Sequence, residues 1–124
     1  MPGDVFRVRI CESASKAIRR IGRKFGTKTY ETIRDLILDL ASEPEKKGEP
    51  LRGNLKGLFS RHYSRFRTIY SIERTELVVL VIAAGFHEDD SRSDVYKTIE
   101  RLLESGAISI RDELSSDSGK TEPR

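Results

Sequence analysis

One stretch decides how this chain folds: Phe59-Ser60-Arg61-His62-Tyr63-Ser64-Arg65-Phe66-Arg67-Thr68-Ile69-Tyr70. Aromatic and polar side chains alternate on both sides of the pair Ser64-Arg65, which predicts two antiparallel strands joined by a two-residue turn. With the turn centred on this pair, His62 faces Arg67 across the two strands. The pairing depends on the register, because a slip by one residue would move every side chain to the opposite face.

The predicted register divides the side chains of this hairpin between two faces. The aromatic face, which we expect to pack against helices, carries Phe59, Tyr63, Phe66, Tyr70 and Ile72. The opposite face, which we expect to be uncovered, carries Ser60, His62, Arg67 and Ser71. Arg61 falls on the aromatic side, from which its long side chain can reach an edge of the sheet.

The segments around the hairpin alternate between strand and helix periodicity. The stretch 77–84 is apolar at every position, which is typical of a central strand covered on both faces. Two amphipathic helices separated by Gly26 form a hairpin whose apolar stripes need a flat surface to cover. Ser91 or Ser93 is the predicted N-cap of a last helix. The predicted strands are 5–11, 58–63, 66–73 and 77–84, and the predicted helices are 14–25, 30–40 and 95–103.

This order, β-α-α-β-β-β-α, predicts an α+β fold in which the N-terminal helical hairpin packs on one face of an antiparallel sheet. The 124 residues suit a single domain, which we expect to span residues 1–110. Residues 111–124 are polar and lack large anchoring side chains in their last part, so we expect a disordered C-terminal tail.

Composition excludes several kinds of site. Cys11 is the only cysteine, so an internal disulfide and a cysteine-based zinc cluster are both excluded, and a lone strand cysteine is typical of a buried small side chain. The sequence has no signal-peptide pattern, and its longest apolar run is too short to cross a bilayer. We therefore expect a cytoplasmic protein that does not bind membranes.

Positive charge is concentrated around the hairpin. The chain as a whole carries a formal charge of only +3. Residues 51–74, however, contain six basic residues and one acidic residue. Such a local excess beside a histidine predicts a surface that holds a polyanion. The basic residues of this stretch that we expect to bind RNA are Arg52, Lys56, Arg61 and Arg65.

A histidine facing an arginine also suits cleavage of RNA without a metal ion. The reaction needs a base for the 2′-hydroxyl proton, positive charge on the phosphorane and a proton donor for the leaving 5′-oxygen. Imidazole can fill the first or third role near neutral pH, and guanidinium matches phosphate oxygens for the second. The sequence offers no carboxylate cluster for Mg²⁺, so we expect no metal site and no cofactor.

The residues that carry a family resemblance lie mostly in the second half of the chain. They are Pro50-Leu51-Arg52-Gly53-Asn54-Leu55-Lys56-Gly57-Leu58-Phe59, the segment Phe66-Arg67-Thr68-Ile69-Tyr70, and Asp94-Val95-Tyr96. Together with the element order over residues 5–103, they resemble the RelE/ParE superfamily of bacterial toxins. For a RelE-like member, the resemblance implies metal-independent cleavage of mRNA in the ribosomal A site. It also implies a cognate antitoxin that binds the basic face or the sheet edge, in a toxin–antitoxin hetero-oligomer.

The resemblance also implies roles for four catalytic residues. Arg67 matches an arginine that stabilises phosphate charge, and Tyr96 matches a late tyrosine that stacks on or orients the nucleotide. His62 and His87 stand where relatives often have cations, and we expect them to share proton transfer. Each residue also has a non-catalytic alternative: a sheet-face ion pair for Arg67, a solvated side chain for His62, the start of a polar loop for His87, and core packing for Tyr96.

The sequence departs from the family pattern at two places. Ser60 occupies a position that is often basic, and His87 is followed by Glu88-Asp89-Asp90 where relatives usually carry cations. Two further functions therefore remain open. One is a ParE-like inhibitor of DNA gyrase that needs no proton transfer, and the other is a degenerate relative that only binds an antitoxin or RNA.

Overall fold

The computed structural model describes residues 4–86 and 94–106. The four predicted strands and three predicted helices are all present, together with a two-residue strand and three short helical turns. The elements are β1 (Arg7–Ile10), α1 (Glu12–Phe25), α2 (Thr27–Leu38), η1 (Asp39–Ala41), α3 (Pro44–Lys47), β2 (Glu49–Pro50), η2 (Gly53–Leu55), β3 (Phe59–Tyr63), β4 (Phe66–Glu73), β5 (Val78–Phe86) and α4 (Val95–Glu104).

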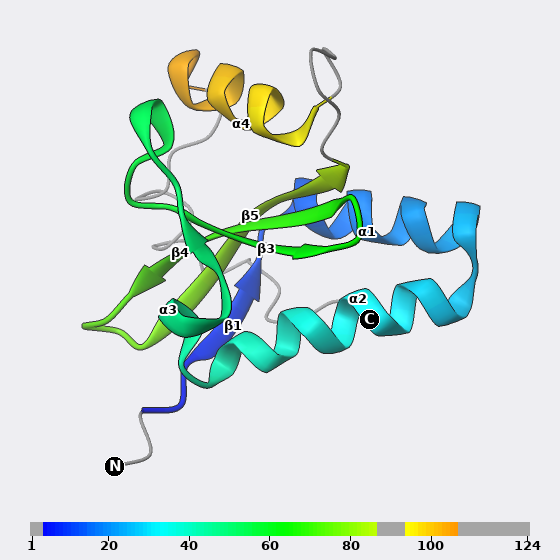
Figure 1. Ribbon diagram of the computed structural model, residues 1–124, viewed down its shortest axis with the longest axis horizontal. Helices are drawn as coiled ribbons and strands as arrows, with labels where there is room; N and C mark the ends of the chain where they lie inside the picture. The colour runs from blue at the N-terminus through cyan, green and yellow to red at the C-terminus, as the bar shows by residue number, and fades with distance from the viewer. Residues whose placement is uncertain (1–3, 87–93, 107–124) are drawn as a thin grey trace.

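The strands form one five-stranded sheet in the order β1-β5-β4-β3-β2. Helices α1 and α2 lie on one side of this sheet, and α4 crosses the other side (Figure 1). The α+β class and the helical hairpin on one face are therefore as predicted. Strand β5 is central, between β1 and β4, and its residues from Val78 to Ile82 are buried, as its apolar sequence indicates.

The predicted hairpin register is confirmed. His62 pairs with Arg67 and Tyr63 with Phe66, so the turn is formed by Ser64 and Arg65. Ser64 has φ 56°, in the left-handed region that a two-residue turn commonly requires, although no glycine is present. The side chains of β3 and β4 are therefore distributed between the two faces as the alternation predicts.

The prediction of a wholly antiparallel sheet is wrong for the first strand. β1 pairs with β5 in parallel, from Arg7 opposite Val78 to Ile10 opposite Val81. The strands β3, β4 and β5 are connected by short turns, which enforce antiparallel neighbours. β1 meets its partner only after most of the chain has intervened, so no short turn dictates its direction.

Two apolar cores result, one on each face of the sheet. The core beneath α1 and α2 contains Ile18, Ile37, Phe66 and Tyr70, among others. The core beneath α4 joins Ile69, Leu80 and Ile82 of the sheet to Val95 and Ile99 of the helix. The second face was predicted to be uncovered, and that prediction is wrong for the part under α4, because Ile69, Leu80 and Ile82 supply an apolar surface that a helix buries.

Tyr70 ties the helix side of the sheet to the segment before β2. Its ring is fully buried and stacks on Phe59 with centroids 5.7 Å apart, and its hydroxyl donates to the carbonyl oxygen of Pro44 at 2.8 Å. Burial raises the pKa of Tyr70 to about 12, so the phenol remains a neutral donor. Gly48 lies directly against this hydroxyl, where a Cβ would have no room.

We expect Gly48→Ala to destabilise the fold. A new Cβ would collide with the Tyr70 hydroxyl and would lie 2.9 Å from the carbonyl oxygen of Ser60. Overpacking of this kind costs about 1–3 kcal/mol, which urea unfolding would measure. Gly85→Ala is the matched control, because its Cβ would meet Val95 at an ordinary 3.5 Å. Equal unfolding midpoints for the two variants would contradict this account of Tyr70.

Candidate active site on the sheet

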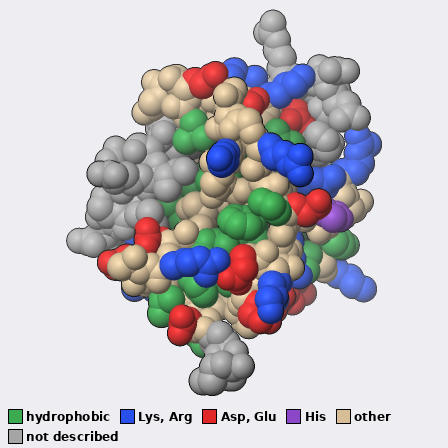
Figure 2. Space-filling view, turned by 60° about the vertical axis from the view of Figure 1, so that its left-hand side comes forward, with side chains coloured by type: hydrophobic (Ala, Val, Ile, Leu, Met, Phe, Trp, Pro, Cys, Tyr) green, Lys and Arg blue, Asp and Glu red, His purple; other side chains and the backbone are tan. Residues whose placement is uncertain are grey.

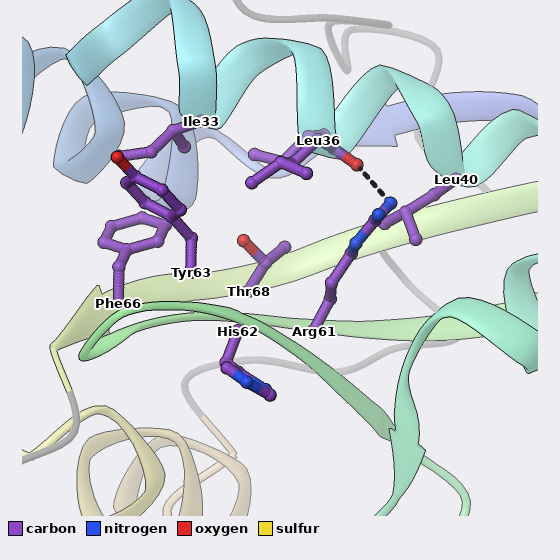
Figure 3. Close-up of a pocket in the computed structure, with 9 residues that line it drawn as sticks. Ile33, Leu36, Leu40, Arg61, His62, Tyr63, Phe66 and Thr68 are labelled. Carbon is purple, nitrogen blue, oxygen red and sulfur yellow. Dashed lines mark hydrogen bonds between the residues drawn. The ribbon is translucent and has the colours of Figure 1, made fainter.

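His62 and Arg67 are neighbours on the side of the sheet that α4 partly covers. They are paired across β3 and β4, and residues so paired have Cβ atoms about 4.5–5.5 Å apart. The His62 side chain is exposed and Arg67 is half-buried. Figure 3 shows His62 pointing away from α2, to the opposite side of the sheet from Arg61, Tyr63 and Thr68. An imidazole and a guanidinium group therefore share an accessible surface.

The guanidinium group of Arg67 is held at the end of the hairpin. Its Nη1 donates to the carbonyl oxygen of Ser64 at 2.8 Å and to that of Phe66 at 3.2 Å. Among the described residues no carboxylate forms an ion pair with Arg67, so the alternative of a sheet-face ion pair finds no support there. A guanidinium group carries five N–H donors, so this anchoring leaves donors for a phosphate.

Tyr96 enters the same surface from helix α4. Asp94 is the N-cap of this helix, and its carboxylate accepts hydrogen bonds from the backbone N–H groups of Tyr96 and Lys97 at 3.0 and 3.3 Å. The predicted cap at Ser91 or Ser93 is therefore wrong, because Asp94 has an equally good capping side chain directly before the first helical residue.

The phenol of Tyr96 reaches β3. Its hydroxyl lies 2.8 Å from Oγ of Ser60, and one of the two hydroxyls donates to the other. Ser60 precedes His62 by two positions, so both side chains are on the same face and their Cα atoms are separated by roughly 7 Å. Tyr96 also packs at the margin of the apolar core under α4. It thus combines the predicted core packing with a polar contact beside His62.

Three of the four predicted catalytic residues are described: His62 pairs with Arg67 across β3 and β4, and Tyr96 contacts Ser60, two positions before His62 on the same face. The fourth, His87, lies outside the described residues, as does the acidic stretch Glu88-Asp89-Asp90. The sequence places Ser60 on the same face as His62 and Arg67, but it gives Ser60 no role beyond the absence of a cation. The contact of Ser60 with Tyr96 could not be predicted from alternation along the strand, because it joins residues 36 positions apart.

Arg61 lies on the other side of the sheet from this group. Its Nη1 donates to the carbonyl oxygen of Leu36 and to Oδ2 of Asp39, both at 3.0 Å (Figure 3). Lys47 contacts the same carboxylate at 3.1 Å. The hydrogen bond from Arg61, and then that from Lys47, lower the pKa of Asp39. Arg61 therefore joins β3 to the end of α2, and we leave it out of the candidate site.

The other predicted RNA-binding residues are exposed. Arg65 forms part of the hairpin turn, and Arg52 and Lys56 flank the short helical turn η2. Leu55 and Leu58 are buried in the same core as α4, which fixes this segment beside the candidate site. Figure 2 shows Lys and Arg side chains interspersed with acidic ones and with a hydrophobic patch on one face of the molecule. The cations are thus scattered rather than gathered into one continuous patch on that face.

The residues that the structure describes contain no group of three or more His, Cys, Asp or Glu side chains placed to hold a metal ion. Within the same residues, no helix is both long enough and apolar enough to cross a membrane.

A family model described as the ParE toxin of the type II toxin-antitoxin system parDE matches residues 8–91. The chain belongs to this toxin family, within the RelE/ParE superfamily. The toxin RelG of Mycobacterium tuberculosis is 34% identical over 59 residues, a match that covers 48% of this chain and 62% of RelG. The chain thus matches less than two thirds of the length of this curated relative.

Solved structures of toxins share the fold of this family member. The toxin–antitoxin complex RelBE2 of M. tuberculosis contains a chain with a TM-score of 0.58 and 24% identity, over 67% of this chain and 99% of that one. A YoeB/ParE toxin from Agrobacterium tumefaciens has a TM-score of 0.57 and 24% identity, over 67% of this chain and all of its own. Isolated RelE of E. coli has a TM-score of 0.55 and 23% identity, over 80% and 99% of the two chains. At these identities the likeness shows the fold alone.

The contact between Arg61 and Asp39 predicts a pH-dependent contribution to stability. Because the pKa of Asp39 is lowered in the folded protein, its stabilising effect is present at neutral pH and is lost as the pH falls through that pKa. We expect Asp39→Asn to lower the free energy of unfolding at pH 7 by roughly 0.2–1 kcal/mol, the range for partly exposed ion pairs.

Urea unfolding at pH 7 and pH 3 would measure this difference, which should shrink at the lower pH. Asp35→Asn is the control, since in the described part of the chain the exposed carboxylate of Asp35 forms an ion pair only with its neighbour Arg34, at 3.3 Å. A difference between the wild type and Asp39→Asn that stays constant with pH would contradict the role given to Arg61.

Proposed function

We propose that this family member is an endoribonuclease toxin that cleaves mRNA on the ribosome without a metal ion. One observation carries the proposal: an exposed histidine and an arginine face each other across β3 and β4, with a tyrosine from α4 anchored beside them. This group combines a titratable base, a fixed cation and an aromatic ring, which are the parts that metal-free RNA cleavage uses.

In the proposed reaction, His62 removes the proton of a 2′-hydroxyl group. The 2′-oxygen then forms a bond to the adjacent phosphorus, and the bond from phosphorus to the 5′-oxygen breaks. A protonated histidine gives its proton to that leaving oxygen, a role that we propose for His87. The products are a 2′,3′-cyclic phosphate and a 5′-hydroxyl group, so that atoms and charge balance.

Arg67 would stabilise the charge that develops on the phosphorane oxygens. Its Nη1 is already held by the carbonyl oxygens of Ser64 and Phe66, so the group would be in place before the substrate binds. Such preorganised donors contribute most where charge appears in the transition state. The exposed Arg52, Lys56 and Arg65 would contact the RNA backbone without reading its sequence.

The proposal includes a cognate antitoxin as partner, forming a hetero-oligomer with this chain. Two of the solved relatives with the same fold are toxin–antitoxin complexes, namely RelBE2 of M. tuberculosis and RelBE of E. coli. An antitoxin could add a strand to a sheet edge or lay a helix over the exposed surface around His62. Covering that surface would block access of RNA.

A ParE-like inhibitor of DNA gyrase is the second candidate, and the specific observation in its favour is that the matching family is named for ParE. Such a protein acts by binding and needs no proton transfer.

A relative that binds an antitoxin or RNA without cutting is the remaining candidate, and the departure from a cation at Ser60 favours it. Only the nuclease, among these three candidates, needs titratable groups at positions 62 and 87.

We expect Arg67→Ala to slow cleavage of mRNA on translating ribosomes by roughly 100-fold or more, as loss of a preorganised donor does in other enzymes. The assay would map cut sites by primer extension. Arg74→Ala is the matched control, because Arg74 directly follows the far end of β4 and forms an ion pair with Glu45 at 2.7 Å. If wild-type protein arrests growth but cuts no mRNA, the nuclease proposal is wrong.

We expect replacement of both histidines, His62→Gln with His87→Gln, to abolish growth arrest if the protein is a nuclease, because no other histidine can transfer the protons. Growth after induction without antitoxin would be measured beside a gyrase supercoiling assay. Full arrest by the double variant, with supercoiling inhibited, would favour the ParE-like function instead.

A further inference from the structure

We propose that Ser60 is a positioning residue that holds the phenol of Tyr96 beside His62 and Arg67. This inference rests on the proposed nuclease function and adds a residue to it. The observation behind it is the 2.8 Å contact between the hydroxyl groups of Ser60 and Tyr96, which links strand β3 to the first turn of α4.

Ser60 is well placed to act as a fixed anchor. Its backbone is paired on one side with Glu49 of β2 and on the other with Ile69 of β4. Its side chain is only 5% exposed. His62, two positions further along, has a partner on β4 but none on β2. Ser60 is therefore the last position on this face of β3 that is held by strands on both sides.

Tyr96 is held at both of its ends. Its backbone N–H donates to the carboxylate of Asp94, while the flanking residues Val95 and Ile99 are buried against the sheet. Its phenol oxygen is fixed by Ser60 at the other end. A side chain anchored in this way has lost most of its rotational freedom before any substrate binds, so binding costs less entropy.

The anchored ring has a position that suits a nucleotide base. Ser60 and His62 lie on the same face of β3, and Ile69 and Arg67, their partners, lie on the same face of β4. The phenol oxygen, fixed at Ser60, therefore lies at the Ser60–Ile69 pair, which is the neighbour of the His62–Arg67 pair on this face. Stacking of a base on such a ring would set the distance from the adjoining 2′-hydroxyl group to the imidazole.

The chain offers a matched control in Ser71. It faces the same side of the sheet and is 8% exposed, much like Ser60. Its Oγ has no hydrogen-bond partner in the part of the chain that the structure describes. Replacing either serine by alanine removes one buried hydroxyl group, but only Ser60→Ala removes the contact with Tyr96.

The experiment compares five variants: Ser60→Ala, Ser60→Thr, Tyr96→Phe, the double variant Ser60→Ala with Tyr96→Phe, and Ser71→Ala. Single-turnover cleavage of ribosome-bound mRNA is measured at saturating ribosomes, so that binding does not limit the rate. We expect Ser60→Ala and Tyr96→Phe each to slow cleavage about three- to tenfold, the effect of one lost hydrogen bond, and the double variant to be no slower than either. Ser60→Thr keeps the hydroxyl group and should restore the rate, and Ser71→Ala should cleave like the wild type.

A readout independent of activity accompanies the rates. The unfolding equilibrium constants of the same variants form a double-mutant cycle, in which the effects of Ser60→Ala and Tyr96→Phe should overlap rather than multiply. Multiplying effects would show that the two hydroxyl groups are not coupled and would overturn the contact itself. A normal cleavage rate in Ser60→Ala, while the wild type cuts mRNA, would overturn the positioning role and leave the nuclease function intact. A wild type that cuts nothing would overturn both the proposed function and the role of Ser60 in it.

Discussion

The register between β3 and β4 is the constraint on which the rest of the molecule depends. A two-residue turn at Ser64-Arg65 fixes it, with Ser64 accepting a left-handed backbone. A slip by one residue would turn His62 toward α2 and expose the aromatic side chains that form the core beneath the helical hairpin. Burial of the aromatic side chains on one face therefore fixes the register, and the register fixes which side chains lie on the other face.

The side of the sheet that α4 covers loses its cover toward the hairpin tip, and the candidate site lies where that cover stops. On the helix side, Phe66 is still buried next to the turn, although its partner Tyr63 is exposed. On the other side, Ser60 is buried under α4, whereas His62 is open to solvent. The candidate site thus combines a position held by strands on both sides, at Ser60, with a side chain open to solvent, at His62. The proposed substrate, an RNA held on a ribosome, would need such an open edge rather than a closed cavity.

The hairpin could be read from the sequence because its information is local. Alternation around Ser64-Arg65 predicts the register, the face of each side chain and the place of the charged Arg61 on the aromatic face. The structure adds the groups that Arg61 bonds there, the carbonyl oxygen of Leu36 and the carboxylate of Asp39. The parallel direction of β1 and the cover provided by α4 depend on contacts between distant segments, which alternation does not encode. The sequence predicted Ser91 or Ser93 as the N-cap of α4 and missed Asp94, because serine and aspartate side chains can both cap a helix. His87 lies outside the described residues and stays a prediction.

At Ser60 the family pattern often has a cation, whereas this chain has a hydroxyl group that fixes a neighbouring side chain. A cation at this place would attract a polyanion, but over a distance limited by salt to about 8 Å, and its long side chain would keep several rotamers. The short hydroxyl group of Ser60 instead fixes the phenol of Tyr96 at 2.8 Å, and salt does not screen that contact. In the proposed nuclease, attraction of the RNA backbone would then fall to exposed cations such as Arg52 and Arg65. Binding and orientation are thereby assigned to different residues, so that each can change without loss of the other.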